Sequence, residues 1–132
     1  MIHEHIGGLI QTYSDIKEIW LIGSRAEGNP RQNSDWDYLI FANHRVLRAL
    51  RQKKYFNLPS TDLLIVYDGD RFEKPWREGT VRKGGSLTGW GWKRVSATEA
   101  TYKAAKFSDD GDFFHVGRAK RVWPFSEVGI DG

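Results

Sequence analysis

Apolar residues recur along the first half of the chain with two alternating periods, one helical and one extended. Over residues 1–13 and 44–56 they fall three or four positions apart, which predicts amphipathic helices. Short runs rich in branched and aromatic residues predict strands over 18–23, 35–42 and 61–67. The order helix, strand, strand, helix, strand indicates a mixed α/β fold, with a small mixed β-sheet flanked by helices.

The second half of the chain has a weaker pattern that is broken by glycines. Five glycines between residues 79 and 91 favour short strands or a hairpin. Ser96 and Glu99 have the spacing of a helix-capping box, so residues 96–107 are expected to form a short helix. Beyond Asp109, turn residues mix with aromatic residues, which predicts a loosely regular segment. The residues expected to pack it are Phe113, Phe114, Val116, Trp123 and Phe125.

Length and composition favour one domain inside the cell. The 132 residues leave little room for a second core, so we expect a single domain with a core at 1–70 and a β-rich, Gly/Trp-rich extension at 71–132. There is no cysteine, which excludes disulfides, thiolate metal sites and a cysteine nucleophile. The first 13 residues lack the segments of a signal peptide, and no apolar run approaches the roughly 20 residues of a membrane span. We therefore expect a cytoplasmic protein with no membrane partner.

Charge is distributed unevenly between the two halves. Residues 1–70 hold 8 Lys/Arg and 9 Asp/Glu, a net charge of −1, whereas residues 71–132 hold 12 and 8, a net charge of +4. The carboxylates available for chemistry are therefore in the first half. The positive excess is compatible with a polyanionic partner such as nucleic acid, and equally with a solvated basic face.

Two aspartates, Asp35 and Asp37, open the run at 35–42. Side chains alternate along a strand, so both carboxylates point to one face, about 7 Å apart at their Cα atoms. Like charges held on one face repel each other unless a cation lies between them. Mg²⁺ is a hard cation that binds one or two carboxylates together with water and phosphate oxygens. The pair therefore indicates a metal site, although such pairs also occur on ordinary surface strands.

The end of the preceding strand has the features of a phosphate site. Gly23 lets the backbone approach a ligand closely, and exposed N–H groups at such a turn favour an anion. Ser24 adds a hydroxyl group, and Arg25 adds a charge that suits phosphate. A nucleoside triphosphate with Mg²⁺ would satisfy this edge and the neighbouring acids together. The alternative is a solvated loop between two strands.

The stretch "GSRAEGNPRQNSDWDYLI" resembles the motif of the nucleotidyltransferase superfamily related to DNA polymerase β, which is Gly-Ser, ten residues, then Asp-x-Asp. Arg25, Ala26, Gly28 and Ser34 also resemble the small "minimal" nucleotidyltransferases of prokaryotes. The resemblance covers about residues 1–70 and implies the nucleotidyltransferase fold. It departs from many relatives after Tyr67, where a Gly- and Trp-rich segment takes the place of a helical region.

The resemblance also implies a third carboxylate on an adjacent strand. Asp62 matches it, because it is an acid that opens the apolar run at 61–67. In that role it would help to hold metal and act as general base on an acceptor hydroxyl. Asp68 and Asp70 compete for this assignment, but the sequence Asp-Gly-Asp is typical of a turn.

Taken with the motif, these residues imply an enzyme. Asp35, Asp37 and Asp62 would be catalytic and bind Mg²⁺ or Mn²⁺. Gly23, Ser24 and Arg25 would hold the β- and γ-phosphates of a nucleoside triphosphate, with ATP as the expected donor. A nucleotidyl group would pass to a hydroxyl of an unknown protein or small-molecule acceptor, releasing pyrophosphate. The competing interpretation is a catalytically silent module of the same fold that binds nucleotide or a partner protein.

Trp90 and Trp92 lie at the centre of the extension and allow two interpretations. They are either a stacking surface for a nucleobase or packing residues of the sheet, and the second is favoured because large aromatics in a small domain are mostly buried. Lys93 and Arg94 beside them are candidates for phosphate contacts, or else a solvated strand end.

Overall fold

A computed structural model of the chain describes residues 4–23, 25–26, 36–76, 84–108 and 111–124, and side chains over these ranges except at 104–108 and 111–115. The helices are α1 (Glu4–Thr12), α2 (His44–Arg51) and α3 (Leu87–Trp90), with one 3₁₀ turn at Lys54–Phe56. The strands are β1 (Glu18–Ile22), β2 (Trp36–Phe41), β3 (Thr61–Val66), β4 (Arg71–Glu73), β5 (Gly84–Ser86), β6 (Lys93–Arg94), β7 (Glu99–Ser108) and β8 (Gly111–Trp123).

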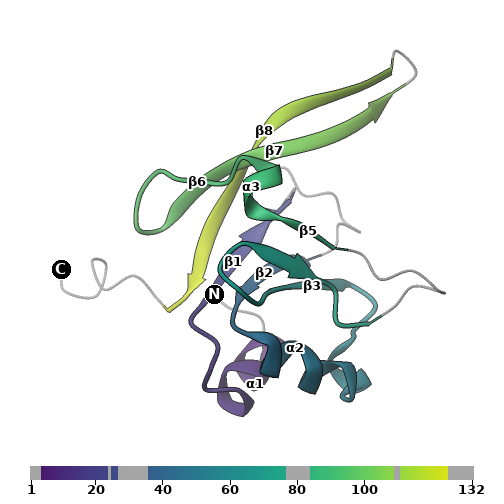
Figure 1. Cartoon of the computed structure of the whole chain (residues 1–132), viewed down its shortest axis with the longest axis vertical. Coiled ribbons are helices and arrows are strands. Elements are labelled where there is room, and N and C mark those ends of the chain that lie inside the picture. The colour runs from purple at the N-terminus through teal and green to yellow at the C-terminus, as the bar shows by residue number, and fades with distance from the viewer. Residues whose placement is uncertain (1–3, 24, 27–35, 77–83, 109–110, 125–132) are drawn as a thin grey trace.

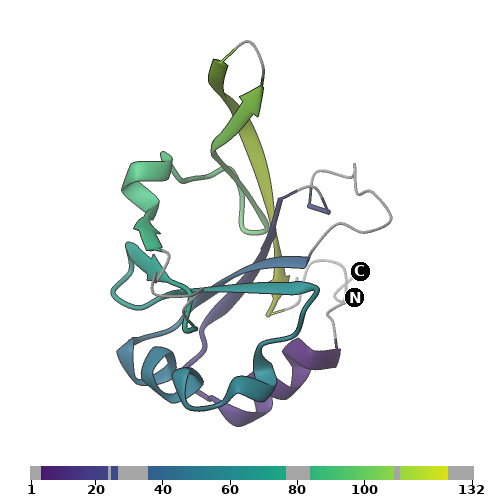
Figure 2. The same cartoon turned by 90° about the vertical axis from the view of Figure 1, so that its right-hand side faces the viewer.

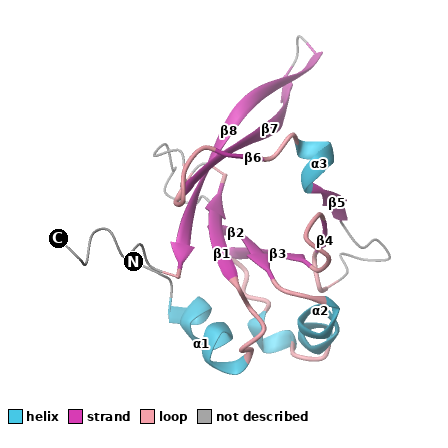
Figure 3. Cartoon of the chain, turned by 60° about the vertical axis from the view of Figure 1, so that its left-hand side comes forward, coloured by secondary structure: helices cyan, strands magenta, loops and turns pink. Residues whose placement is uncertain are grey.

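All eight of these strands form one mixed sheet, in the order β5-β4-β3-β2-β1-β8-β7-β6. Strands β2 and β3 are parallel, and the other described pairs are antiparallel. The sheet curls, and β7 and β8 extend from it as a long two-stranded ribbon (Figures 1 and 3). The predicted α/β class with a β-rich second half is confirmed, and the sheet is larger than expected.

Helices α1 and α2 lie together on one side of the sheet, and the ribbon of β7 and β8 rises on the other side (Figure 2). Alternation along the strands explains this arrangement. On β2, Tyr38 and Ile40 are buried among the helices, while Leu39 is buried on the opposite face with Trp20 of β1. Burying each such large side chain contributes roughly 1.5–3 kcal/mol. The sheet therefore has two cores, one beneath the helices and one inside its own curl.

The predicted strands 18–23, 35–42 and 61–67 are confirmed within one or two residues. The predicted helix at 44–56 ends earlier. Asn43 caps α2 by accepting a hydrogen bond from the Val46 N–H. After Arg51 the chain tightens into 3₁₀ geometry, which buries Phe56 against the helical side of the sheet. No helix in the described ranges is long and apolar enough to cross a membrane.

The predicted helix at 96–107 is wrong, because β7 occupies Glu99–Ser108. Ser96 and Glu99 form a tight turn instead, in which the N–H groups of Val95 and Ser96 donate to the Glu99 carbonyl. Pairing with β8 along the whole of β7 outweighs the local capping signal. This pairing also buries Tyr102.

The segment after Asp109 was expected to be loosely regular, and it forms the 13-residue strand β8. Of its expected packing residues, Trp123 packs partly buried beneath the helices. Val116 does not pack, because 65% of it is exposed. The side chains of Phe113 and Phe114 and the whole of Phe125 lie outside the described residues.

Candidate active site

Asp37 and Asp62 lie directly side by side. Strands β2 and β3 run parallel with Asp37 opposite Asp62, so their side chains leave the sheet on the same face, with the strands about 4.8 Å apart. This face is the one inside the curl, because Trp36 and Tyr38 flank Asp37 and pack toward the helices. The same alternation that buries Tyr38 therefore brings both carboxylates to the open face.

The two aspartates lie at the wall of a cavity of about 480 Å³, a size typical of small-molecule sites. Hydrophobic and aromatic side chains form most of the wall, and two lysines provide positive charge. The lining residues among those described are Ile22, Gly23, Asp37, Asp62, Leu64, Phe72, Lys74, Gly84, Trp90, Tyr102 and Lys103. The cavity thus brings two carboxylates together with aromatic side chains.

Gly23 follows the last residue of β1 and lies immediately next to Asp37. Its φ of +78° is a left-handed conformation that favours glycine, and a Cβ atom there would lie 2.5 Å from Asp37 Oδ2. Its N–H donates a hydrogen bond of 3.0 Å to the Tyr102 hydroxyl oxygen. The backbone at Gly23 therefore supplies a donor within the acidic cavity, at a point where no side chain fits.

Tyr102 reaches Gly23 because its ring lies over a glycine of the neighbouring strand. Tyr102 on β7 pairs with Gly117 on β8, and a Cβ atom at Gly117 would come within 2.7 Å of the tyrosine ring. The bare backbone lets the ring lie close to the strand, where it also stacks on Trp90 with ring centroids 5.1 Å apart. Sequence reasoning missed Tyr102, since its place depends on the β7–β8 register.

Lys74 is the second residue that sequence reasoning missed. It follows β4, and its Nζ lies 2.8 Å from Asp62 Oδ1. Its side chain is 14% exposed, whereas that of Asp62 is 42% exposed. Nothing in the spacing of "RFEKPW" marks this lysine as part of a site. Its role depends on the β3–β4 pairing.

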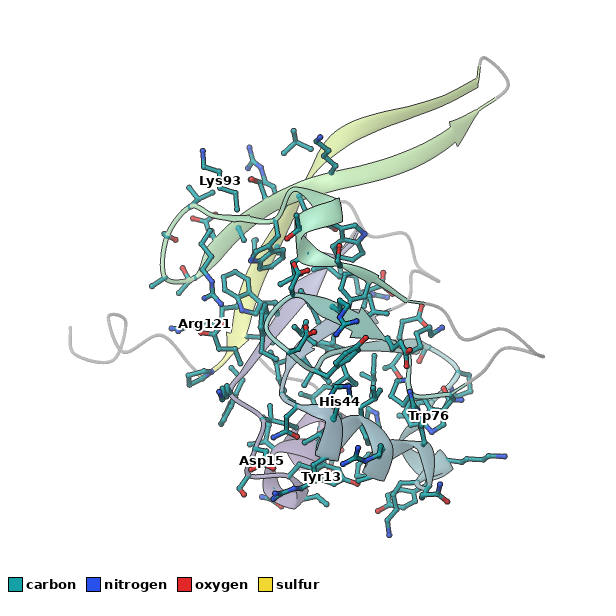
Figure 4. The ribbon with its side chains drawn as sticks, in the orientation of Figure 1. Tyr13, Asp15, His44, Trp76, Lys93 and Arg121 are labelled. Carbon is teal, nitrogen blue, oxygen red and sulfur yellow. The ribbon has the colours of Figure 1, made fainter. Side chains whose placement is uncertain are left out.

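Three other cations proposed from the sequence lie elsewhere. The Arg25 guanidinium lies over the Trp36 ring, 4.2 Å from its centroid, and Arg25 does not line the cavity. Lys93 is exposed on β6, on the outer side of the ribbon (Figure 4). Arg94 lies 2.8 Å from Glu18 Oε1 and over the Trp20 ring. None of the three lines the cavity beside the two described acids, Asp37 and Asp62.

Arg94 has a structural partner in Glu18. Burial favours the neutral form of Glu18, but hydrogen bonds from Arg94 and Trp20 and the charges of Arg94 and Arg121 outweigh it, so the pKa of Glu18 is lowered. Arg121 extends from β8 beside this group (Figure 4). Arg94 therefore forms an ion pair that links β6 to β1.

Trp90 and Trp92 have different surroundings. Trp92 packs edge-on against Trp20, with centroids 5.2 Å apart, and does not line the cavity. Trp90 lines the cavity and packs between Phe72 and Tyr102, at 4.5 and 5.1 Å. Both side chains are half-buried. Packing therefore accounts for Trp92, whereas Trp90 both packs against its neighbours and lines the cavity.

Ser24 and Asp35 lie outside the described residues. In the part of the chain that the structure describes, no group of three or more His, Asp or Glu side chains gathers as a metal cluster. Among the described residues that line the cavity, Asp37 and Asp62 provide a pair of carboxylate oxygen donors. One or two carboxylates are what Mg²⁺ takes from a protein when phosphate and water complete its shell.

Comparison with protein families gives a match over the first half of the chain. The family described as "Polymerase beta, Nucleotidyltransferase" matches residues 4–70, half of the sequence. The chain belongs to this nucleotidyltransferase family. No curated protein and no solved structure matched it.

The family assignment indicates nucleotidyl transfer as the general class of reaction. The matched segment carries Gly23, Asp37 and Asp62, so the acidic part of the cavity falls within it. Lys74, Trp90 and Tyr102 lie beyond residue 70, in the part of the chain that the family match does not cover.

Proposed function

We propose that this nucleotidyltransferase moves a nucleoside monophosphate, with ATP as the expected donor, onto a hydroxyl group of a protein or small-molecule acceptor. The observation that supports this most is the register of β2 and β3, which holds Asp37 and Asp62 side by side in a cavity beside the Gly23 backbone. From the sequence motif, Ser24 and Asp35 belong to the same site.

The donor set fits Mg²⁺. Carboxylates are hard oxygen ligands, and two of them on one face favour a cation between them. Asp37 and Asp62 would hold the metal, with Asp35 from the motif. When bound, the ion would neutralise the charge of the triphosphate and that developing on the reacting oxygens. Mn²⁺ has similar preferences and is the natural probe.

The residues of the chain would orient the reaction. The Gly23 N–H would donate to a phosphate oxygen, in the place where it now meets the Tyr102 hydroxyl. The acceptor oxygen would form a bond to the α-phosphorus, the bond from that phosphorus to the bridging oxygen would break, and pyrophosphate would leave. Asp62 would take the proton of the acceptor hydroxyl and pass it to water. Positioning and electrostatics would supply most of the rate enhancement.

A silent binding module is the alternative. A scaffold that only binds a partner has no need for two carboxylates in register at the wall of a ligand-sized cavity. The cavity beside them also has the volume of a ligand site. We therefore favour an active nucleotidyltransferase over a catalytically silent binding module.

The test uses ATP labelled at either phosphorus. Full-length protein, Mg²⁺ and a lysate of the cells that express it are incubated with α-labelled or γ-labelled ATP. Nucleotidyl transfer predicts a labelled acceptor with the α-label only, release of pyrophosphate, and loss of both in EDTA. Transfer of the γ-label would assign a kinase instead. Nucleotide binding by calorimetry without any pyrophosphate would favour the silent module.

Trp90 is expected to hold the nucleobase, because it is the tryptophan that lines the cavity. We expect Trp90→Ala to raise the Kd of a non-hydrolysable ATP analogue with Mg²⁺ roughly 5- to 150-fold, since a stacked base contributes about 1–3 kcal/mol. Calorimetry measures this directly. Trp92→Ala is the matched control, and it should lower the unfolding temperature while leaving that Kd near the wild-type value. Equal effects of both substitutions would argue against base stacking on Trp90.

A further inference from the structure

Lys74 lies beside Asp62, one of the carboxylates to which the proposed function assigns the metal. Its ammonium group lies 2.8 Å from Oδ1 of Asp62, one of the two acids in register. Both residues line the same cavity. Without metal, Lys74 therefore neutralises one of the two neighbouring carboxylates.

The backbone fixes this lysine on the cavity side. Glu73 pairs with Ile65 across β3 and β4, so the next residue, Lys74, falls beside Leu64, two positions from Asp62 on the same face. Glu73 itself points the other way and forms an ion pair with Arg51 of α2. The strand is thus held from the helical side, while the lysine extends over the acids. The four-carbon side chain of Lys74 is long and flexible, so its ammonium group can change position while the backbone stays in place.

Charge makes the observed pair incompatible with a metal on the same oxygen. An ammonium group and a divalent cation sharing one carboxylate oxygen would be a few Å apart and repel strongly in a partly enclosed site. Lys74 must therefore leave Asp62 when metal enters there. The displaced ammonium group is attracted to any negative charge that enters the same cavity. The triphosphate of the donor brings such a charge.

We propose that Lys74 exchanges partners during substrate binding, from Asp62 to the triphosphate, and so makes metal and triphosphate bind together. The inference rests on the proposed function. It places a triphosphate-binding residue in the part of the chain that the family match does not cover. Metal alone has to displace the lysine from Asp62, and triphosphate alone meets the negative charge of Asp37 and Asp62, so each ligand binds more weakly without the other.

The test measures binding, without turnover. Mn²⁺ binding to the full-length protein is followed by electron paramagnetic resonance, with and without inorganic tripolyphosphate, in wild type and in Lys74→Met. In wild type, tripolyphosphate should tighten Mn²⁺ binding about 5- to 150-fold, the usual range of coupling between two sites. Lys74→Met should bind Mn²⁺ alone more tightly than wild type, and should bind tripolyphosphate more weakly at saturating Mn²⁺.

The second effect is the decisive one. A lysine that merely neutralises Asp62 would give tighter Mn²⁺ binding on removal, but tripolyphosphate binding would stay the same or improve. That result would overturn the inference. Lys74→Gln is a second neutral variant with the same expectation, should Lys74→Met fail to fold. Lys93→Met removes the same charge from an exposed position on β6 and should change neither affinity.

The outcome is separable from that of the proposed function. Tripolyphosphate carries no base and cannot donate a nucleotidyl group, so its coupling to Mn²⁺ is measured whether or not an acceptor is ever labelled. If the label-transfer assay fails and the opposite shifts in Lys74→Met are present, the partner exchange stands as a property of ligand binding. If label transfer occurs and Lys74→Met does not show these changes in affinity, the proposed role of Lys74 is wrong and the proposed function is unaffected.

Discussion

Asp37→Asn is expected to lower the rate of nucleotidyl transfer by at least about 10²–10³-fold, the loss seen when one preorganised electrostatic contact is removed from a transition state. The amide has nearly the same shape as the carboxylate but no charge to hold a metal. It also ends the repulsion with Asp62 on the neighbouring strand, so the fold should be retained. Label transfer from α-labelled ATP measures the rate, and circular dichroism checks the fold.

Asp68→Asn is the matched control. This carboxylate accepts the backbone N–H groups of Arg71 and Asp70 in the turn after β3. The backbone and side-chain hydrogen bonds of Arg71 lower the pKa of Asp68 to about 2. Because an asparagine can accept the same backbone bonds and the residue does not line the cavity, transfer should continue at the wild-type rate. Equal losses in both variants would indicate a general charge effect and refute a specific role for Asp37.

Gly23→Ala is expected to damage both stability and activity. A non-glycine residue held at positive φ costs on the order of 1–3 kcal/mol. The new methyl group would also lie 2.5 Å from Asp37 Oδ2, so the carboxylate or the strand end must shift. A displacement of about 1 Å at a catalytic group can cost roughly 100-fold in rate. Urea unfolding and the label-transfer assay measure the two losses separately.

Gly69→Ala separates backbone strain from damage to the site. Gly69 has a similar φ of +85°, but a Cβ atom there would have no neighbour within 4 Å. It lies in the exposed turn after β3, away from the cavity. We expect a similar loss of stability with normal transfer. If Gly69→Ala lowers transfer as much as Gly23→Ala does, the close approach of Gly23 to Asp37 has no special importance.

The face of the sheet that carries Asp37 and Asp62 could be predicted from the sequence, because it depends on local rules. Two short apolar runs, each opening on an aspartate, give β2 and β3, and alternation along each strand decides which side chains face the helices. The neighbouring position of Asp37 and Asp62 follows once those strands pair in parallel. The Gly23 turn is likewise local, since a glycine at the end of a strand predicts a special backbone conformation.

The rest of the site depends on pairings between distant segments. The helix predicted at 96–107 failed because a capping box is a signal of four residues, and β8 offers the same segment a partner along its full length. Tyr102 enters the cavity only through that pairing, and Lys74 only through the register of β3 and β4. Neither residue type nor spacing identifies such positions before the strands are placed.

The position of β1 has a consequence for the newly made chain. This strand lies between β2 and β8, and Ile19 pairs with Trp123, about 100 residues further on. One edge of β1 therefore stays unpaired on the ribosome until the segment 111–123 has been translated and released. Closing so long a loop is slow, and an open apolar edge invites association with other chains. Synthesis of this protein should thus include an interval in which this edge of β1 is open to pairing with other chains.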